Sequence, residues 1–126
     1  MKVTFLIAEG AGKHVDQTVS ILRAGLNRVT GPRLPIPFRA AVVILFEAEP
    51  GDVGPHRYAI RCVSEDGRDL IAPICEEFAV TALPATHSIV QPLAGGFLSV
   101  GKVRWLLEVD QEVRAQTTML VALEEG

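Results

Sequence analysis

The alternation of apolar and polar side chains along the chain constrains the fold most strongly. From Val103 to Val109 the odd positions are apolar and the even positions are mostly polar, and residues 115–123 continue the pattern less strictly. A period of two places successive side chains on opposite sides of an extended backbone. This is typical of strands with one face on a core and the other in water, so both segments are predicted to be strands.

Further runs of this kind predict strands along the rest of the chain. The longest, Phe38 to Glu49, has an unbroken apolar face and carries Val43 and Leu45 in the middle of its other face, which favours a central position in a sheet. The other expected strands are residues 2–8, 57–65, 68–83 with an interruption at Pro73, and 88–93. Turn formers, among them Gly95-Gly96, separate these runs. The pattern predicts one domain, residues 1–126, folded as an all-β antiparallel sandwich, immunoglobulin-like or jelly-roll-like, of about seven to nine strands.

The segment from Val15 to Val29 admits two interpretations. Its apolar residues recur at helical spacing, and Asp16 could cap the N-terminus of a helix. However, residues 17–23 are also compatible with a strand, and Gly25 would weaken a helix. We favour a strand from about 17 to 23, because the first expected strand of an all-β chain needs a neighbour to pair with.

Charge and hydropathy exclude several classes of partner. The formal net charge is −3 and the charges are interspersed, whereas nucleic acid selects clustered basic surface. No apolar stretch reaches the roughly 18 residues that a membrane helix needs. The N-terminal residues lack the layout of a secretory signal. We therefore expect a cytoplasmic protein with no nucleic-acid or membrane partner.

The two cysteines support the same compartment. Cys62 and Cys75 lie on segments that should form a hairpin around Asp66-Gly67, a strong two-residue turn signal. If Glu65 pairs with Arg68 across this turn, the two cysteines are offset along the strands by roughly four residues, or about 13 Å. That distance is too long for a disulfide. We expect two free, mostly buried thiols, as is usual in a reducing compartment.

A glycine-rich segment, Gly10 to Lys13, raises the possibility of a phosphate-binding loop. If Gly12-Lys13 were the Gly-Lys pair of a P-loop, the first glycine would fall on Ile7 and the magnesium-binding hydroxyl on His14. The dinucleotide pattern fails in the same way, because Val15 stands where its third glycine belongs. We interpret Gly10 and Gly12 as a turn that ends the first strand through positive φ angles.

No constellation of residues predicts catalysis, a metal or a cofactor. The three histidines are widely separated, the cysteines lack a C-x-x-C spacing, and no G-x-S-x-G motif occurs. Trp105, Phe5, Phe46 and Phe78 are interpreted as core residues. Phe97, after Gly95-Gly96, is the best candidate for an exposed aromatic. Together with His14 and His87 it defines a possible ligand-binding set of loops.

Several segments resemble a bacterial family of small proteins of unknown function. They are Val3 to Glu9, a second strand that reads ILRAGLNRV from Ile21 to Val29, the Pro37-Phe38 entry into a long strand, the Glu-Asp-Gly hairpin, and Leu106 to Asp110. The resemblance implies a single β-sandwich and supports the strand interpretation of residues 17–23. It implies no catalytic residues and no function.

The sequence therefore favours a non-catalytic protein-interaction or assembly module of the bacterial cytoplasm. Strands that are apolar on both faces are the positive indication, since a sandwich of this size cannot cover both faces of its sheets. Val43, Leu45 and Leu106 are expected to form an exposed sheet face that meets a second copy or a partner protein. The alternative is a sandwich that binds a small molecule or carbohydrate.

Overall fold

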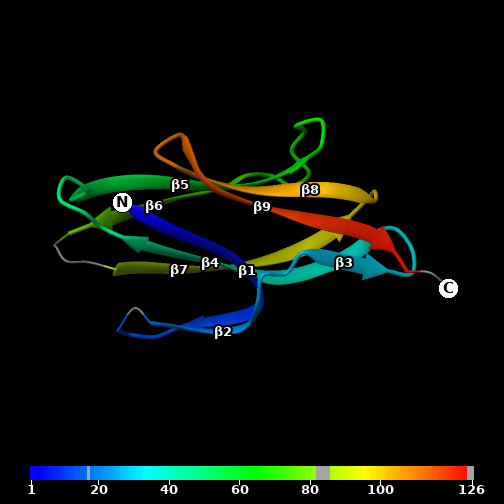
Figure 1. Cartoon of the computed structure of the whole chain (residues 1–126), viewed down its shortest axis with the longest axis horizontal. Coiled ribbons are helices and arrows are strands. Elements are labelled where there is room, and N and C mark those ends of the chain that lie inside the picture. The colour runs from blue at the N-terminus through cyan, green and yellow to red at the C-terminus, as the bar shows by residue number, and fades with distance from the viewer. Residues whose placement is uncertain (17, 82–85, 125–126) are drawn as a thin grey trace.

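The computed structural model describes residues 1–16, 18–81 and 86–124, and these residues form nine strands in two sheets (Figure 1). The strands are β1 (Lys2–Lys13), β2 (Val19–Ala24), β3 (Arg28–Gly31), β4 (Ile36–Glu47), β5 (Gly54–Ser64), β6 (Ile74–Val80), β7 (Thr86–Phe97), β8 (Gly101–Val109) and β9 (Glu112–Leu123). The predicted all-β sandwich is confirmed. Of the expected strand 68–83, residues 82 and 83 lie outside the described part.

The order of the strands follows the immunoglobulin-like option. One sheet has the order β2-β1-β4-β7, and the other has the order β3-β9-β8-β5-β6. The order β9-β8-β5, facing β4-β7, corresponds to the G-F-C and B-E strands of an immunoglobulin domain, with β6 added next to β5. All pairs are antiparallel except β3 with β9, which makes the five-stranded sheet mixed rather than antiparallel as expected.

The core lies between the inner faces of the two sheets. On β4 the side chains of Phe38, Ala40, Val42, Ile44 and Phe46 all belong to it, as the unbroken apolar face predicted. Trp105 is 1% exposed and Phe78 is buried, as expected, whereas Phe5 is only half-buried. Trp105 lies at an odd position of β8, so its burial agrees with the alternation that predicted a half-buried strand there.

The N-terminal strand continues beyond its predicted end. Gly10 and Gly12 lie inside β1 and pair with Leu22 and Ser20 of β2, and neither has a positive φ, so the predicted turn there is wrong. The strand interpretation is confirmed from Val19 to Arg23 by β2, and residue 17 of the expected range 17–23 lies outside the described part. β2 and the second half of β1 bend away from the rest of their four-stranded sheet and form a third layer (Figure 1).

The burial of its residues corrects the expected exposed sheet face. Val43 is fully buried, Leu45 is half-buried and Leu106 is 9% exposed. Val43 lies between Leu6 and Val90 on its sheet. Leu106 lies between Arg61 and Gln116, whose long side chains share its face. Val43 and Leu106 are therefore buried within the protein, and Leu45 keeps only part of its surface exposed.

The chain turns after β5 at Asp66-Gly67 as expected, but Arg68 pairs with Ser64 rather than with Glu65. Gly67 has a φ of 82°, and the backbone N–H of Ser64 bonds the carbonyl of Arg68. Both cysteines are free, as predicted. Cys75 pairs with Ala59, three residues before Cys62, because the connection between β5 and β6 is irregular. Cys75 is exposed rather than buried, since it faces away from the core at the start of edge strand β6.

Within the described residues there is no helix with the length and apolar character needed to cross a membrane.

Candidate functional site

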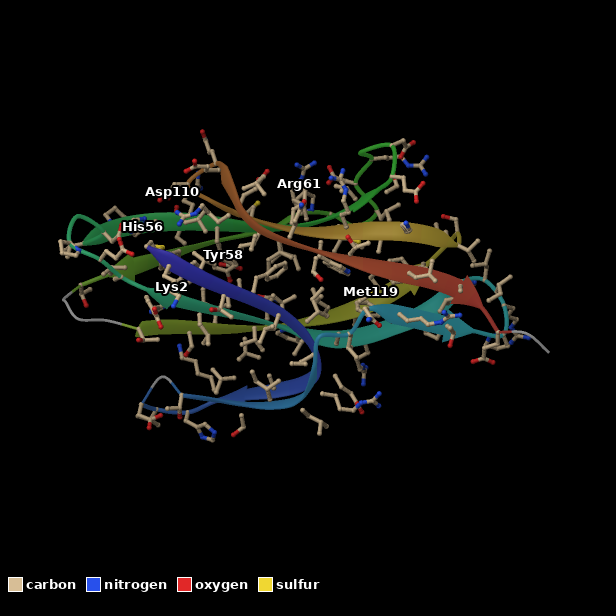
Figure 2. All side chains as sticks on the ribbon, viewed as in Figure 1. Lys2, His56, Tyr58, Arg61, Asp110 and Met119 are labelled. Atoms are coloured by element: carbon tan, nitrogen blue, oxygen red, sulfur yellow. The ribbon has the colours of Figure 1, made fainter. Side chains whose placement is uncertain are left out.

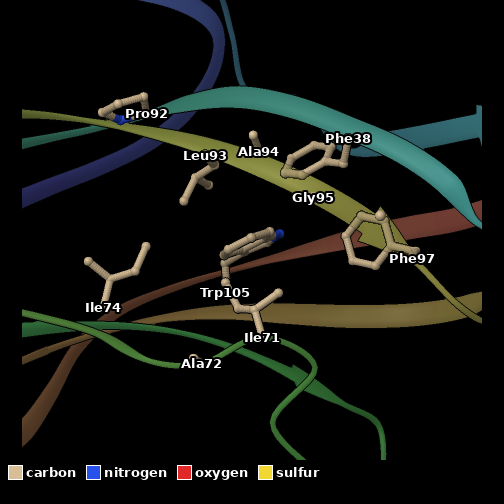
Figure 3. A pocket seen from close by; sticks show the side chains of 11 residues that line it. Phe38, Ile71, Ala72, Ile74, Pro92, Leu93, Ala94, Gly95, Phe97 and Trp105 are labelled. Atoms are coloured by element: carbon tan, nitrogen blue, oxygen red, sulfur yellow. The ribbon is translucent and has the colours of Figure 1, made fainter.

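A cavity of about 220 Å³ opens between the two sheets at the side where β6 and β7 are the last strands (Figure 3). We call it the edge cleft. Phe38 of β4 and residues 92–97 of β7 form one wall. Ile71 and Ile74, from the segment that leads into β6, form the other, and Trp105 of β8 forms the floor. The lining is predominantly apolar, as is usual for binding sites.

The sequence keeps this cleft open at Gly95. Gly95 pairs with Phe38, so a side chain at this position would point toward the space between the sheets. A Cβ placed there would meet nothing within 4 Å, and the φ of Gly95 is not positive. The glycine is therefore not required by the backbone conformation. Its effect is to leave the wall of the cleft without a side chain.

Trp105 presents a polar atom in this apolar surrounding. Its side chain is 1% exposed, and its indole Nε1–H has no hydrogen-bond partner among the described residues. The nitrogen end of the ring points toward the side of the cleft that Phe38 and Phe97 form (Figure 3). The ring centroid of Phe38 is 5.8 Å from that of Trp105 and 5.3 Å from that of Phe97. A buried tryptophan N–H normally finds an acceptor, whereas this one, which lies beneath the surface of the cleft, has none among the described residues.

The nearest nucleophile is inert. Cys62 pairs with Trp105 on the neighbouring strand and is fully buried. Burial, and to a lesser degree the charge of Asp69, raises the pKa of the Cys62 thiol to about 12. The thiol therefore stays protonated at neutral pH, and a protonated thiol is a poor nucleophile and metal ligand.

The opposite end of the sandwich is closed by stacked rings, which we call the histidine end. The ring of Phe78 stacks on those of Phe46, His56 and His87, with centroid distances of 4.4, 5.3 and 5.4 Å. Figure 2 shows His56 and Asp110 together at this end. The Nδ1 atom of His56 is 2.7 Å from Oδ2 of Asp110, and its Nε2 is 2.6 Å from the carbonyl oxygen of Asp52.

The pKa values of the two histidines at this end are shifted in opposite directions. The hydrogen bond with Asp110, followed by the one with the Asp52 carbonyl, raises the pKa of His56. The same bond with His56 lowers the pKa of Asp110. Burial, followed by the positive charge of Lys13, lowers the pKa of His87. These groups already have protein partners, and the described residues contain no group of three or more His, Cys, Asp or Glu side chains that could hold a metal ion.

The structure does not bring the expected ligand-binding residues together. His14 is exposed beyond the end of β1 and hydrogen-bonds Ser20. His87 and Phe97 lie near opposite ends of β7. Phe97 is 6% exposed, so the expected exposed loop aromatic is wrong. The reason is that Gly95-Gly96 lies inside β7 and the strand continues to Phe97, which turns its ring into the core.

Phe97 nevertheless lines the edge cleft. The sequence did not indicate that the other residues around the cleft form a site. Trp105 was interpreted as an ordinary core residue, and Ile71 and Ile74 as part of a strand. The one available signal was Gly95, a glycine on the apolar parity of the strand that begins before it. A strand glycine can mark a site where another molecule approaches closely.

The described residues thus define an immunoglobulin-like sandwich with an apolar cleft at one edge. The chain belongs to a family of unknown function (DUF6941), whose model matches residues 3–122. No curated protein and no solved structure matches the chain. The family model confirms the expected membership of a family of unknown function, and it provides no role.

Proposed function

We propose that this protein is a non-catalytic interaction module that binds a partner protein through the edge cleft. The cleft receives one apolar side chain that carries a hydrogen-bond acceptor. The observation that supports this proposal is the buried indole N–H of Trp105, which no acceptor among the described residues satisfies.

The energetic argument rests on the cost of that donor. A buried polar group without a partner destabilises a protein by about 1–3 kcal/mol. An acceptor delivered by a bound group removes this cost, and its apolar body displaces water from Phe38, Leu93 and Phe97. The site therefore favours a group with both properties over a purely apolar or purely polar one.

The size of the cleft favours a side chain over a whole metabolite. A cavity of roughly 150 Å³ holds a benzene molecule, and the edge cleft encloses about 220 Å³. Pockets for drug-sized ligands are larger, on the order of 300–1,000 Å³. One aromatic ring with one polar substituent fits, and the rest of the ligand must lie outside the cleft.

Two further features support a binding role in a bacterial cytoplasm. Cys62, which pairs with Trp105, has a thiol pKa of about 12 and is therefore a poor nucleophile at neutral pH. The two cysteines of the sequence are free, which suits a reducing compartment.

The proposal can be tested through Trp105, the one tryptophan of the sequence. Protein labelled with ¹⁵N is titrated with benzyl alcohol and with toluene while the indole N–H cross-peak is followed. We expect saturable shifts with both compounds, a downfield proton shift with the alcohol only, and about tenfold tighter binding of the alcohol.

A pair of variants shows where the compounds bind. Gly95→Val fills the cleft and should weaken binding of benzyl alcohol at least about tenfold. Gly12→Val makes the same change at a strand glycine of β1 that also has open space around it, and should leave binding unchanged. If the Trp105 cross-peak does not respond to either compound, or if Gly95→Val binds like the unmodified protein, the proposal is wrong.

A free small molecule is the second candidate ligand, because one ring with one acceptor fills the cleft by itself. A thermal-shift screen of such compounds separates the two candidates, since a tight ligand raises the apparent stability. A compound that binds with micromolar affinity without any peptide portion would favour the small molecule. A carbohydrate is not favoured, because Phe97 and Trp105 are buried and offer no exposed platform.

A further inference from the structure

Strand β7 is the last strand of its sheet, and no other described strand lies on its outer side. Among the described residues it pairs with β4 alone, along its whole length from Thr86 to Phe97. In an immunoglobulin domain the corresponding strand E also pairs with a strand D. Here β6 lies in the other sheet, and β7 follows it in the chain. A strand-shaped position beside β7, directly over the edge cleft, therefore has no occupant from the described chain.

Pro92 shows which backbone groups of β7 face this position. A proline within a sheet is found where its missing N–H would point away from the neighbouring strand. The carbonyl of Pro92 agrees with this, because it accepts a hydrogen bond from the side chain of Gln91. In an antiparallel strand the N–H and C=O of one residue point to the same side, and this side alternates along the chain. The groups of Val90, Ala94 and Gly96 therefore face outward with those of Pro92.

We propose that an extended segment of a partner polypeptide pairs with β7 between Val90 and Gly96 and places one tyrosine side chain into the edge cleft. This inference rests on the proposed function and adds the class of partner and its mode of binding. Backbone N–H and C=O groups in a row are matched by another extended strand, which is the basis of recognition by strand addition.

The geometry of a strand selects the side chain. Successive residues of an added strand point alternately toward the core side and the outer side of the sheet. The residue that faces the core side lies opposite Ile71 and Ile74 and above Trp105. Tyrosine fits because its ring matches the apolar walls and its hydroxyl oxygen can accept a hydrogen bond from the indole. Leu98, which is 81% exposed immediately after β7, extends the apolar contact for the segment.

A second copy of this chain does not meet these requirements. If β7 of another copy were paired with β7, its core-facing side chains, including Leu93 and Phe97, would be held in its own sandwich. No side chain of that strand would then be free to enter the cleft. A flexible segment has no such restriction.

The experiment uses the full chain and two synthetic peptides, acetyl-Lys-Thr-Thr-Tyr-Thr-Thr-Lys-amide and the same peptide with Phe in place of Tyr. We expect the Tyr peptide to bind about tenfold more tightly and to shift the indole proton of Trp105 downfield. In Trp105→Phe the two peptides should bind equally, because the donor is gone. Gly95→Val should lose binding, and Gly12→Val should keep it.

Backbone pairing is tested separately from occupancy of the cleft. Two versions of the Tyr peptide are N-methylated at alternate amides, one at the odd residues and one at the even residues. One set of methyl groups lies on the edge of the peptide that meets β7, and the other set lies on its free edge. We expect the first version to bind at least about tenfold more weakly and the second to bind as before. Hydrogen exchange at Val90, Ala94 and Gly96 should slow at least about tenfold in the complex.

The outcomes distinguish this inference from the proposed function. If the Tyr peptide shifts Trp105 while both methylated versions bind equally and exchange at Val90 and Ala94 is unchanged, strand addition is wrong and the cleft remains a binding site. If β7 pairs instead with β7 of a second copy of this chain, sedimentation will show a dimer in the absence of peptide. That result would also contradict the inference. If neither the peptides nor benzyl alcohol affects Trp105, both proposals fail.

Discussion

The two ends of the sandwich contain aromatic clusters that are packed in different ways. At the histidine end, Phe78 stacks on Phe46 at 4.4 Å, and the imidazole of His56 has an acceptor for each ring nitrogen. At the edge cleft the rings of Phe38, Phe97 and Trp105 are tilted rather than stacked, with centroid distances of 5.3 and 5.8 Å. There the indole N–H lacks an acceptor among the described residues, and about 220 Å³ is empty.

Under the proposed function, this difference separates a structural from a binding role of aromatic residues in one core. Where rings stack and their polar atoms are satisfied, the core gains packing energy and a closed surface. Where a glycine replaces a side chain and a donor lacks a partner, stability is lost unless another molecule contributes the missing contacts. The predictions below compare the two ends, beginning with the largest expected effect.

The first comparison removes one ring from each end. Phe46→Ala should lower the free energy of unfolding by about 4 kcal/mol, because the ring is fully buried and stacked on Phe78. Phe97→Ala should cost about 2 kcal/mol, because the cleft already leaves one side of that ring without protein contacts. Urea denaturation measures both values. Equal losses would show that the two ends are packed equally well.

The second comparison fills the cleft. Gly95→Val should raise the free energy of unfolding by about 1 kcal/mol, because the new side chain lies against Leu93 and Trp105 and reduces the entropy of the unfolded chain. Gly12→Val, with open space on the exposed hairpin, should change it by less than about half as much. A destabilising effect of Gly95→Val would mean that the cleft is narrower than described here.

The third comparison concerns pH at the histidine end. The pKa of His56 is raised above its ordinary value of 6.5, chiefly by the hydrogen bond with Asp110. Its contribution is therefore fully present below about pH 6.5 and is lost as the pH rises through the raised pKa. His56→Asn should cost more stability at pH 5.5 than at pH 9, by about 0.5 kcal/mol for a partly exposed ion pair.

His87 should show the opposite dependence. Burial lowers its pKa, so the unfolded chain takes up a proton before the folded chain does as the pH falls. His87→Gln should therefore cost less stability at pH 5.5 than at pH 9. Thermal unfolding at the two pH values measures both variants. Parallel pH profiles for His56→Asn and His87→Gln would contradict the opposite pKa shifts.

Much of the fold could be predicted from alternation alone. The unbroken apolar face of β4 and the odd positions of β8 identified the core-facing residues, because burial on one side of a sheet imposes a period of two. What alternation could not predict was which outer faces are covered. Val43 is fully buried, and its neighbours on the sheet, Leu6 and Val90, come from distant parts of the chain.

The edge cleft could not be predicted from the sequence for a related reason. Gly95-Gly96 has the composition of a turn, and the long pairing of β7 with β4 overrides that local preference. Trp105 was correctly predicted to be buried, but a hydrogen bond that is missing in three dimensions has no signature in sequence. The edge cleft arises from residues of four separate segments, which only the fold brings together.

Xenon tests the contrast between the two ends most directly, since it enters apolar cavities without requiring a particular polar group. The ¹H–¹⁵N and methyl spectra of the protein are recorded under increasing xenon pressure. We predict saturable shifts at Leu93, Phe97 and the Trp105 indole, and none at His56 or Phe78. Shifts at the histidine end, or none near Trp105, would contradict the account.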